Sequence, residues 1–213
     1  MGMESIRRIS VYVCLLGTPL LGQTRLENSG ASPAASGPAF DASLGYVYFD
    51  MAEPSSPRAV LNGVDADGLL RFSPHWGATV DSTFAHSGNV HGTGHSDDVI
   101  SGLAGPVFYP MARGNSGILV HVLAGAAWVD GAVPVNRTYY LSGQKTHFSY
   151  AVGGGVEHSL SRPFAVRVGA DYQRTTFLNS SGAMQRENCF RLISGFVYRF
   201  GNPWNRRLGN TLP

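Results

Sequence analysis

The sequence predicts an all-β protein: an eight-stranded antiparallel up-and-down transmembrane β-barrel with a plugged, charged lumen. Three observations support this fold class. Eight segments alternate between apolar residues and small or polar residues with the period of two of an extended strand. The connections between these segments alternate long and short along the chain. Charged residues within the segments fall on the track opposite to the more apolar one.

The last segment, Asn188–Phe200, shows the alternation most clearly. One track carries Phe190, Phe196 and Tyr198, and the other carries Arg191 and Arg199. In a soluble sheet the apolar face points to a core, whereas in a membrane barrel it points outward to lipid. The direction in which this strand faces therefore decides the class of protein.

The composition is unlike that of an average soluble domain or of a nucleic-acid-binding protein. Of the 213 residues only 14% are charged, below the average of about 25% in soluble domains. The 27 glycines are about twice the usual share, as expected where strands bend or pack closely. Lys145 is the only lysine, and with a formal net charge of +2 and no basic run the chain is not expected to bind nucleic acid.

The N-terminus predicts export. Residues 1–23 are interpreted as a signal peptide, because Arg7 and Arg8 precede an apolar stretch, Val11–Leu21, that is too short to span a bilayer. A buried helix is the alternative, but Gly17 and Pro19 would break it. Residues 24–39, rich in Ser, Ala, Gly and Pro, predict a flexible lead-in. The barrel itself is predicted over residues 40–200, with a C-terminal tail at 201–213.

Seven strands are predicted before the last one. They are Asp41–Phe49, Leu61–Phe72, Trp76–His86, Val99–Tyr109, Ser116–Val129, His147–Leu160 and Phe164–Gln173. The fourth and fifth are apolar on both tracks, so their facing is the least determined. We place Leu103, Val107, Tyr109, Ile118, Val120, Val122 and Trp128 outward, and His121 and Gly125 inward.

The connections favour a membrane barrel over a soluble one. Those at 50–60, 87–98, 130–146 and 174–187 each have eleven residues or more, whereas those at 73–75, 110–115 and 161–163 are short. Long extracellular loops opposite short periplasmic turns are typical of bacterial outer-membrane barrels, and an even number of strands closes the sheet without an edge.

Nine charged residues are predicted to line the lumen. A charge that faces hydrocarbon costs roughly 2–4 kcal/mol near the midplane, and an eight-stranded barrel is only wide enough inside for side chains. Buried charges must also be paired, so the near balance of signs predicts a salt-bridged interior without a large pore. The predicted lumen network is Asp65, Asp67, Arg71, Asp81, Glu157, Arg167, Asp171, Arg191 and Arg199.

The opposite track supplies the predicted lipid-facing surface. Its aromatic members would anchor the barrel in outer-membrane lipids. They are Tyr46, Tyr48, Trp76, Phe148, Tyr150, Phe164, Tyr172, Phe190, Phe196, Tyr198 and Phe200.

Several short motifs together resemble a known family. The most specific are Gly153-Gly154-Gly155-Val156, Arg167 followed by Asp171-Tyr172, and Phe190-Arg191-Leu192 with Gly195. With these motifs, residues 40–200 resemble the OmpA/OmpX-type eight-stranded outer-membrane barrels. The resemblance implies a place in the bacterial outer membrane and insertion by the barrel-assembly machinery, whose aromatic signal Phe200 matches. Members of the family include structural anchors, adhesion proteins and lipid-modifying enzymes, and the fold does not choose among them.

Two clusters could carry chemistry, and neither is expected to do so. Glu157, His158 and Ser159 provide the residue types of a serine hydrolase, but the predicted topology places them beside a periplasmic turn, away from outer-leaflet lipid. The loop His91–Asp98 contains two histidines and two aspartates that suit a metal, but a Gly-rich loop rarely preorganises ligands. No catalytic, cofactor-binding or metal-binding residue is therefore predicted.

The sequence as a whole predicts a non-enzymatic outer-membrane barrel with a structural or adhesion-type role. Its long extracellular loops would contact a surface ligand. The sequence leaves two alternatives open. One is a soluble lipocalin-like barrel that binds an apolar ligand, which would need an apolar interior and a polar exterior. The other is a lipid-modifying enzyme of the outer membrane.

Overall fold

The computed structural model of the protein describes residues 39–52, 58–90, 94–113, 115–135, 140–161, 163–178, 181 and 183–200. The predicted signal peptide at 1–23, the lead-in up to residue 38 and the tail at 201–213 lie outside the described residues. Within the described part of the chain, no helix is long and apolar enough to cross a membrane.

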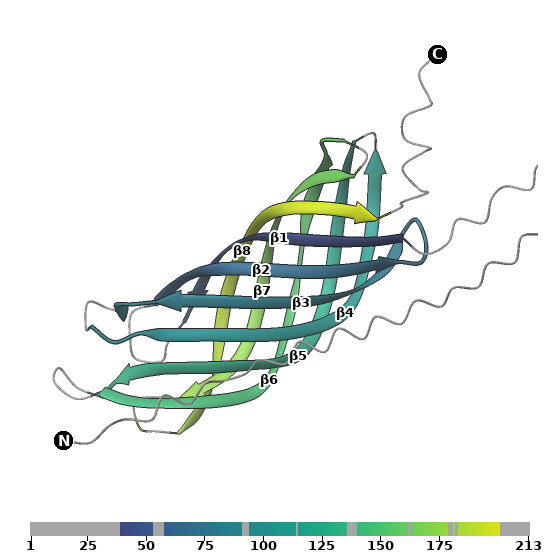
Figure 1. Ribbon diagram of the computed structural model, residues 1–213. Coiled ribbons are helices and arrows are strands. Elements are labelled where there is room, and N and C mark those ends of the chain that lie inside the picture. Colours follow the sequence, from purple (N-terminus) through teal and green to yellow (C-terminus); the bar gives the residue numbers. More distant parts are fainter. Residues whose placement is uncertain are drawn as a thin grey trace, which may run out of the picture. The chain divides into compact units, whose positions relative to one another are not determined.

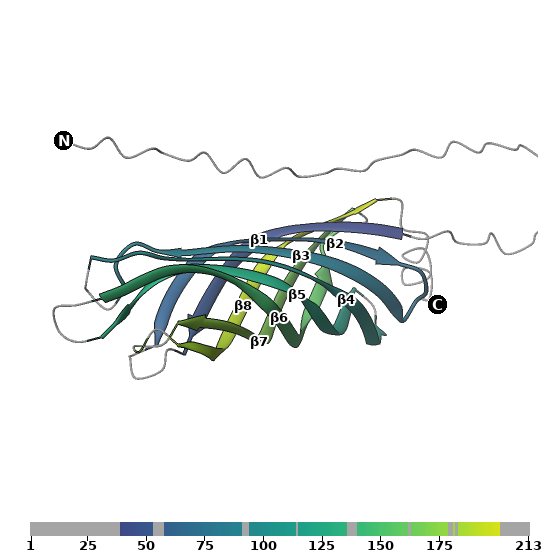
Figure 2. The same ribbon diagram turned by 90° about the horizontal axis from the view of Figure 1, so that it is seen from below.

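Eight antiparallel strands form one closed barrel in chain order, which confirms the predicted fold class. In Figure 1, β8 (yellow) lies beside β1 (purple) and closes the sheet. Figure 2 shows the strands of the near and far walls crossing obliquely, as strand tilt in a small barrel requires. The strands are β1 (Ala39–Met51), β2 (Ala59–Arg71), β3 (Trp76–Ser87), β4 (Asp97–Arg113), β5 (Ser116–Pro134), β6 (Tyr140–Ser159), β7 (Phe164–Leu178) and β8 (Met184–Phe200).

The period of two in the sequence appears directly as alternating exposure. In β3, Trp76, Val80 and Phe84 are exposed on the outer surface, while Thr79 and Asp81 between them are buried. Because successive side chains of a strand point to opposite faces, one track of every strand lines the interior and the other covers the outside. The pattern of β3 is typical of the barrel.

Close approach of strands requires glycine where β8 meets β1. Gly45 and Gly195 are cross-strand partners on the inner track. A Cβ on Gly45 would lie 2.4 Å from the carbonyl oxygen of Ser194, and a Cβ on Gly195 would lie 2.6 Å from that of Leu44. Both distances are far inside van der Waals contact with rigid backbone, so a larger residue would force the two strands apart.

The connections differ from the predicted ones because the strands are longer. β5 and β6 pair as far as Pro134 and Tyr140, and β7 and β8 pair as far as Leu178 and Met184. The predicted loop bounds of 130–146 and 174–187 are therefore wrong, and the connections are residues 135–139 and 179–183. The strands continue where their outer track turns polar, so the alternation that marks a strand in the sequence fades there.

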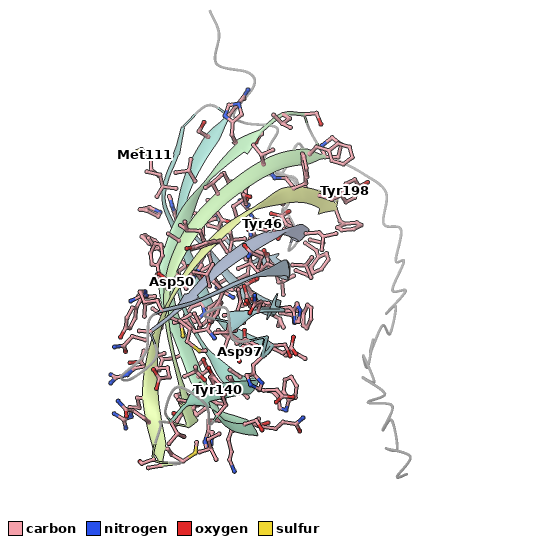
Figure 3. All side chains as sticks on the ribbon, turned by 90° about the vertical axis from the view of Figure 1, so that its left-hand side faces the viewer. Tyr46, Asp50, Asp97, Met111, Tyr140 and Tyr198 are labelled. Carbon is pink, nitrogen blue, oxygen red and sulfur yellow. The ribbon has the colours of Figure 1, made fainter. Side chains whose placement is uncertain are left out.

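Two ends of the barrel can now be distinguished. The connections 52–58, 88–96, 135–139 and 179–183 lie at what we call the long-connection end, and 72–75, 114–115 and 160–163 at the short-turn end. In Figure 3, Asp97 and Tyr140 lie toward the first end and Met111 and Tyr198 toward the second, and Tyr198 points away from the barrel.

The predicted facing of the fourth strand is wrong. Leu103, Val107 and Tyr109 point inward and are at most 3% exposed. Both tracks of β4 are apolar, so alternation could not decide between them. Pairing with β3 determines which track of β4 faces inward, because cross-strand partners point to the same face of a sheet. Leu103 is the partner of the inward-facing Asp81. In β5 the prediction is confirmed: Ile118, Val120 and Val122 are exposed, Trp128 lies on the same track, and His121 and Gly125 lie on the inner one.

A charge on the outer track should oppose insertion. Val168 is 61% exposed on β7, and we expect Val168→Arg to destabilise the barrel in lipid vesicles by about 2–4 kcal/mol, because the guanidinium would face hydrocarbon. Urea titration of folding into vesicles measures this, with Val168→Leu as the matched control. Equal stability of the two variants would contradict the assigned facing.

Candidate functional site

A buried arginine on β8 connects three strands across the lumen. Arg191 is fully buried. Its guanidinium donates to Asp81 at 2.8 Å, to Asp171 at 2.6 Å and, more weakly, to Asp65 at 3.5 Å. It also donates to the hydroxyl of Thr83. The partners lie on β2, β3 and β7, so this one side chain bridges opposite walls of the barrel.

A second cluster lies nearer the short-turn end and is centred on Glu157 of β6. This carboxylate accepts from Arg71 at 3.1 Å, from Arg167 at 2.9 Å and from Arg199. Arg167 also donates to Asp67 at 2.8 Å. All nine residues of the predicted lumen network therefore lie on the inner track and take part in ion pairs within these two clusters.

Three members of the network are missing from the sequence-based set. Asp41 is fully buried and pairs with Arg71 at 2.8 Å, and the ring of Tyr109 lies 4.2 Å from the Arg71 guanidinium carbon. His121 reaches Asp171 at 2.8 Å from β5. The sequence pattern was sufficient to predict Asp41, because it lies four residues before Gly45 on β1 and therefore on the same, inner track. It was not sufficient to predict Tyr109, because the facing of β4 was undecided.

The small residues of the inner track make room for these charges. Gly153 is the cross-strand partner of Asp171. A Cβ at Gly153 would lie 1.9 Å from the Asp171 carboxylate oxygen, so the carboxylate occupies the space of the missing side chain. This explains why glycine and charge recur together on the last three strands.

Toward the long-connection end the lumen is filled by apolar side chains. This apolar layer is not among the predicted features, although the inward track of β1 ends in alternating apolar residues. Phe49 and Met51 of β1 pack with Phe177 of β7 and Val133 of β5, and all are at most 1% exposed. The remaining members of this apolar cap are Val47, Ala59, Leu61, Ala85, Val90, Val99, Val129 and Cys189.

A small cavity lies among the ionic clusters. The space open to the centres of water molecules is about 40 Å³, and roughly 10–15 Å³ is enough for one water. Asp67, Thr79, His121 and Arg167 contribute to its wall. Its size fits a few buried waters that satisfy polar atoms of the network.

The residue types of a hydrolase are adjacent in sequence but not in space. Glu157 is buried among arginines, and Ser159 accepts from Arg199 at 2.7 Å on the same inner track. His158 is exposed on the outer face and lies 2.9 Å from the hydroxyl of Ser116. Because the histidine and the serine occupy opposite faces of β6, they do not form a nucleophile–base pair.

The predicted metal loop is only partly described, since His91 lies outside the described residues. The ring of His95 packs on that of Tyr140, with centroids 4.5 Å apart. Asp97 accepts from the backbone of Ala132, and Asp98 pairs with His86 at 2.7 Å. Across the described residues, no three His, Cys, Asp or Glu side chains converge as metal ligands.

The outer surface carries the aromatic residues predicted to face lipid. Nine of the eleven are 41–67% exposed, and Tyr48 and Tyr150 are half-buried on the same track. At the short-turn end Tyr198 contacts Phe164 and Phe200, with centroids 5.3 Å and 4.6 Å apart. A charged interior within an apolar exterior is the reverse of a lipocalin, which argues against that alternative.

Removing the central guanidinium should destabilise the barrel. Arg191→Met leaves Asp65, Asp81 and Asp171 buried without their common cation, and we expect a loss of about 3–5 kcal/mol. Urea unfolding in vesicles measures the change. Arg58→Met is the control, because Arg58 pairs with Asp50 at the exposed rim and such pairs contribute about 0–1 kcal/mol. A similar small effect for both variants would show that the lumen pairs do not stabilise the fold.

Comparison with known proteins identifies the family. Residues 26–200 match the model of the outer membrane protein beta-barrel domain. Among solved structures, the chain resembles Neisserial surface protein A (TM-score 0.61, 11% identity, 77% of this chain and 99% of that one). It also resembles Ail, the attachment invasion locus protein of Yersinia pestis (TM-score 0.56, 17% identity, 78% of this chain and 99% of that one).

A second structure of Ail, in complex with the heparin analogue sucrose octasulfate, gives a TM-score of 0.53 at 16% identity over 77% and 99% of the two chains. No curated protein matches the chain in sequence. At such low identities the structural likeness shows the fold alone. The match to the domain model covers most of the chain, and the chain therefore belongs to the outer membrane protein β-barrel domain family.

Proposed function

We infer that the protein is a non-enzymatic outer-membrane barrel with a structural or surface-contact role of adhesion type. One observation carries this inference: apart from the small cavity among the ionic clusters, side chains fill the lumen along its length. Ionic clusters occupy the middle and the short-turn end, and the apolar cap occupies the long-connection end. Contact with other molecules therefore falls to the hairpins rather than to a channel.

The direction of these hairpins supports contact outside the cell. Outer-membrane barrels place short turns on the periplasmic side, so the long-connection end faces outward. A transmembrane strand needs about 9–11 residues, whereas β5 and β6 have 19 and 20. The excess extends the β5–β6 hairpin beyond the membrane. Ser142, Gln144 and Lys145 are exposed on it.

The likeness to Ail suggests which ligand class to test first. The solved complex of that protein contains a heparin analogue, a polyanionic sugar. Sulfated glycan is accordingly the first surface ligand that we propose for the hairpins. The lipids of the outer membrane and, during insertion, the barrel-assembly machinery are the other proposed partners, as for any barrel of this kind. The separation of His158 from Ser159 supports the absence of hydrolytic activity.

Shortening the β5–β6 hairpin should abolish surface binding while leaving the barrel intact. Replacing residues 130–144 by Asn-Gly joins the cross-strand pair Val129 and Lys145 through a favoured two-residue turn and removes the exposed Ser142 and Gln144. We expect cells that display this variant to lose adhesion to immobilised heparin, compared with cells displaying the full chain. A neutral polysaccharide is the control ligand, and the same replacement of residues 52–58 is the control variant. Undiminished adhesion would contradict contact through this hairpin.

The filled lumen should not conduct ions. In planar bilayers we expect no stepwise currents of the kind that barrels of about 16–18 strands give through their open channels. A Phe49→Ser/Phe177→Ser variant, which introduces polar groups into the apolar cap, is the comparison. Stable current steps from the unmodified protein would contradict a closed lumen and favour a solute path.

A further inference from the structure

We propose that Arg174 and Arg186 form a phosphate-binding site on the outer surface of β7 and β8, which holds the anionic headgroup of an outer-leaflet lipid. This site is separate from the hairpin contact proposed above. Its ligand chemistry is a phosphate ester attached to a lipid.

A belt of polar residues marks where the apolar outer surface ends. Asn62, His86, Asp98, Asp130 and Gln144 are cross-strand partners of one another in turn, from β2 to β6. All lie on the outer track, on the long-connection side of the exposed Val64, Phe84 and Ile100. Charged and strongly polar side chains are not expected within the hydrocarbon, so these residues lie at the headgroups of the outer leaflet or beyond them.

On β7 and β8, arginines follow the exposed aromatic residues toward the long-connection end. Tyr172 and Phe190 are cross-strand partners and the last exposed aromatic pair. The next outward pair toward the long-connection end is Arg174 with Asn188, and the one after it is Thr176 with Arg186. The two arginines are thus diagonal neighbours on one face, directly beyond the aromatic residues.

Among the described residues these two arginines have no carboxylate partner, whereas the charged residues of the belt have polar partners. Asp98 pairs with His86 at 2.7 Å, and Asp130 accepts from Gln144 at 2.8 Å. Neither Arg174 nor Arg186 forms an ion pair within the described residues, and the Nε of Arg174 is buried without a hydrogen-bond partner. Glu187 lies on the inner track and is 3% exposed, so it faces away from this surface.

Arg174 is the last residue of β7 that has a neighbour on β6. Among the described residues, pairing between β6 and β7 ends at Tyr150 and Arg174. At this point the Ser149 hydroxyl donates to the Arg174 carbonyl at 3.0 Å. Beyond it, the outward side chains of β7 have a strand neighbour only on β8.

The surrounding groups suit a lipid phosphate. A guanidinium offers a planar fork of donors that matches phosphate oxygens, and two such groups can share one phosphate. The Tyr172 hydroxyl donates to the Asn188 side-chain oxygen at 2.7 Å, which leaves the Asn188 amide hydrogens as further donors. Tyr150 lies beside Arg174, and Tyr172 and Phe190 lie on the apolar side of the arginines. These rings provide the amphipathic surface on which the remainder of a lipid headgroup and its chains would rest.

The test compares lipid binding by the full barrel and its R174Q/R186Q variant. Both are purified in detergent, checked for heat-modifiable migration as folded barrels, and titrated with bis-phosphorylated lipid A under native mass spectrometry. We expect the apparent Kd to rise about tenfold or more in the variant, because charge-assisted bonds to phosphate are lost. R58Q is the matched control, and its Kd should not change because Arg58 is already paired with Asp50.

Two further arms identify the source of the phosphate. Dephosphorylated lipid A should bind the full barrel as weakly as the phosphorylated lipid binds the variant. Inorganic phosphate at millimolar concentration should not displace the bound lipid. Equal binding of phosphorylated lipid A by the variant and the full barrel would overturn the proposal. Binding of dephosphorylated lipid A by the full barrel as tightly as phosphorylated lipid A would also overturn it. Displacement of the bound lipid by inorganic phosphate would overturn the assignment to a lipid. Heparin adhesion by the hairpin is measured separately, so failure of one proposal leaves the other testable.

Discussion

The structure depends on the ion pairs that cross the lumen, and above all on the guanidinium of Arg191. This group is anchored on β8 and binds carboxylates on β2, β3 and β7. Asp171 extends the connection to His121 on β5. Glu157 links β6 to β2, β7 and β8 in the same way. Because a buried charge without its partner is costly, these contacts hold the walls of the barrel at fixed distances and close its interior.

The two fillings of the lumen differ in chemistry and position. The ionic clusters lie along the middle and the short-turn end, and the apolar cap lies under the hairpins. A closed interior leaves the outer surface and the hairpins as the places where other molecules meet the protein. Arg174 and Arg186, which have no ion-pair partner among the described residues, and the extended β5–β6 hairpin are separate parts of that surface. We propose the arginines for the headgroups of the membrane and the hairpin for contacts beyond it.

Much of this architecture follows from alternation alone. The tracks of β3 and β8 are unlike enough that Asp81 and Arg191 could be assigned to the interior from their parity. Alternation did not decide β4, where Leu103 and Tyr109 are apolar residues that face inward. It also fails at the long-connection end, where polar residues such as Gln144 occupy the outer track of a continuing strand. Alternation is visible only where the two faces of a strand differ in hydrophobicity. In β4 and at the long-connection end the two faces differ little, so both predictions fail.

The sequence by itself determined the number of strands, their antiparallel order and the inward placement of most charges. These features depend on local periodicity and on the cost of charge in hydrocarbon, which act on each strand separately. Only the tertiary structure decided which carboxylate pairs with which arginine, how far the hairpins extend, and that an apolar cap closes one end. Those features depend on the register between strands and on the meeting of side chains across the lumen, from residues as far apart in the chain as Asp65 and Arg191.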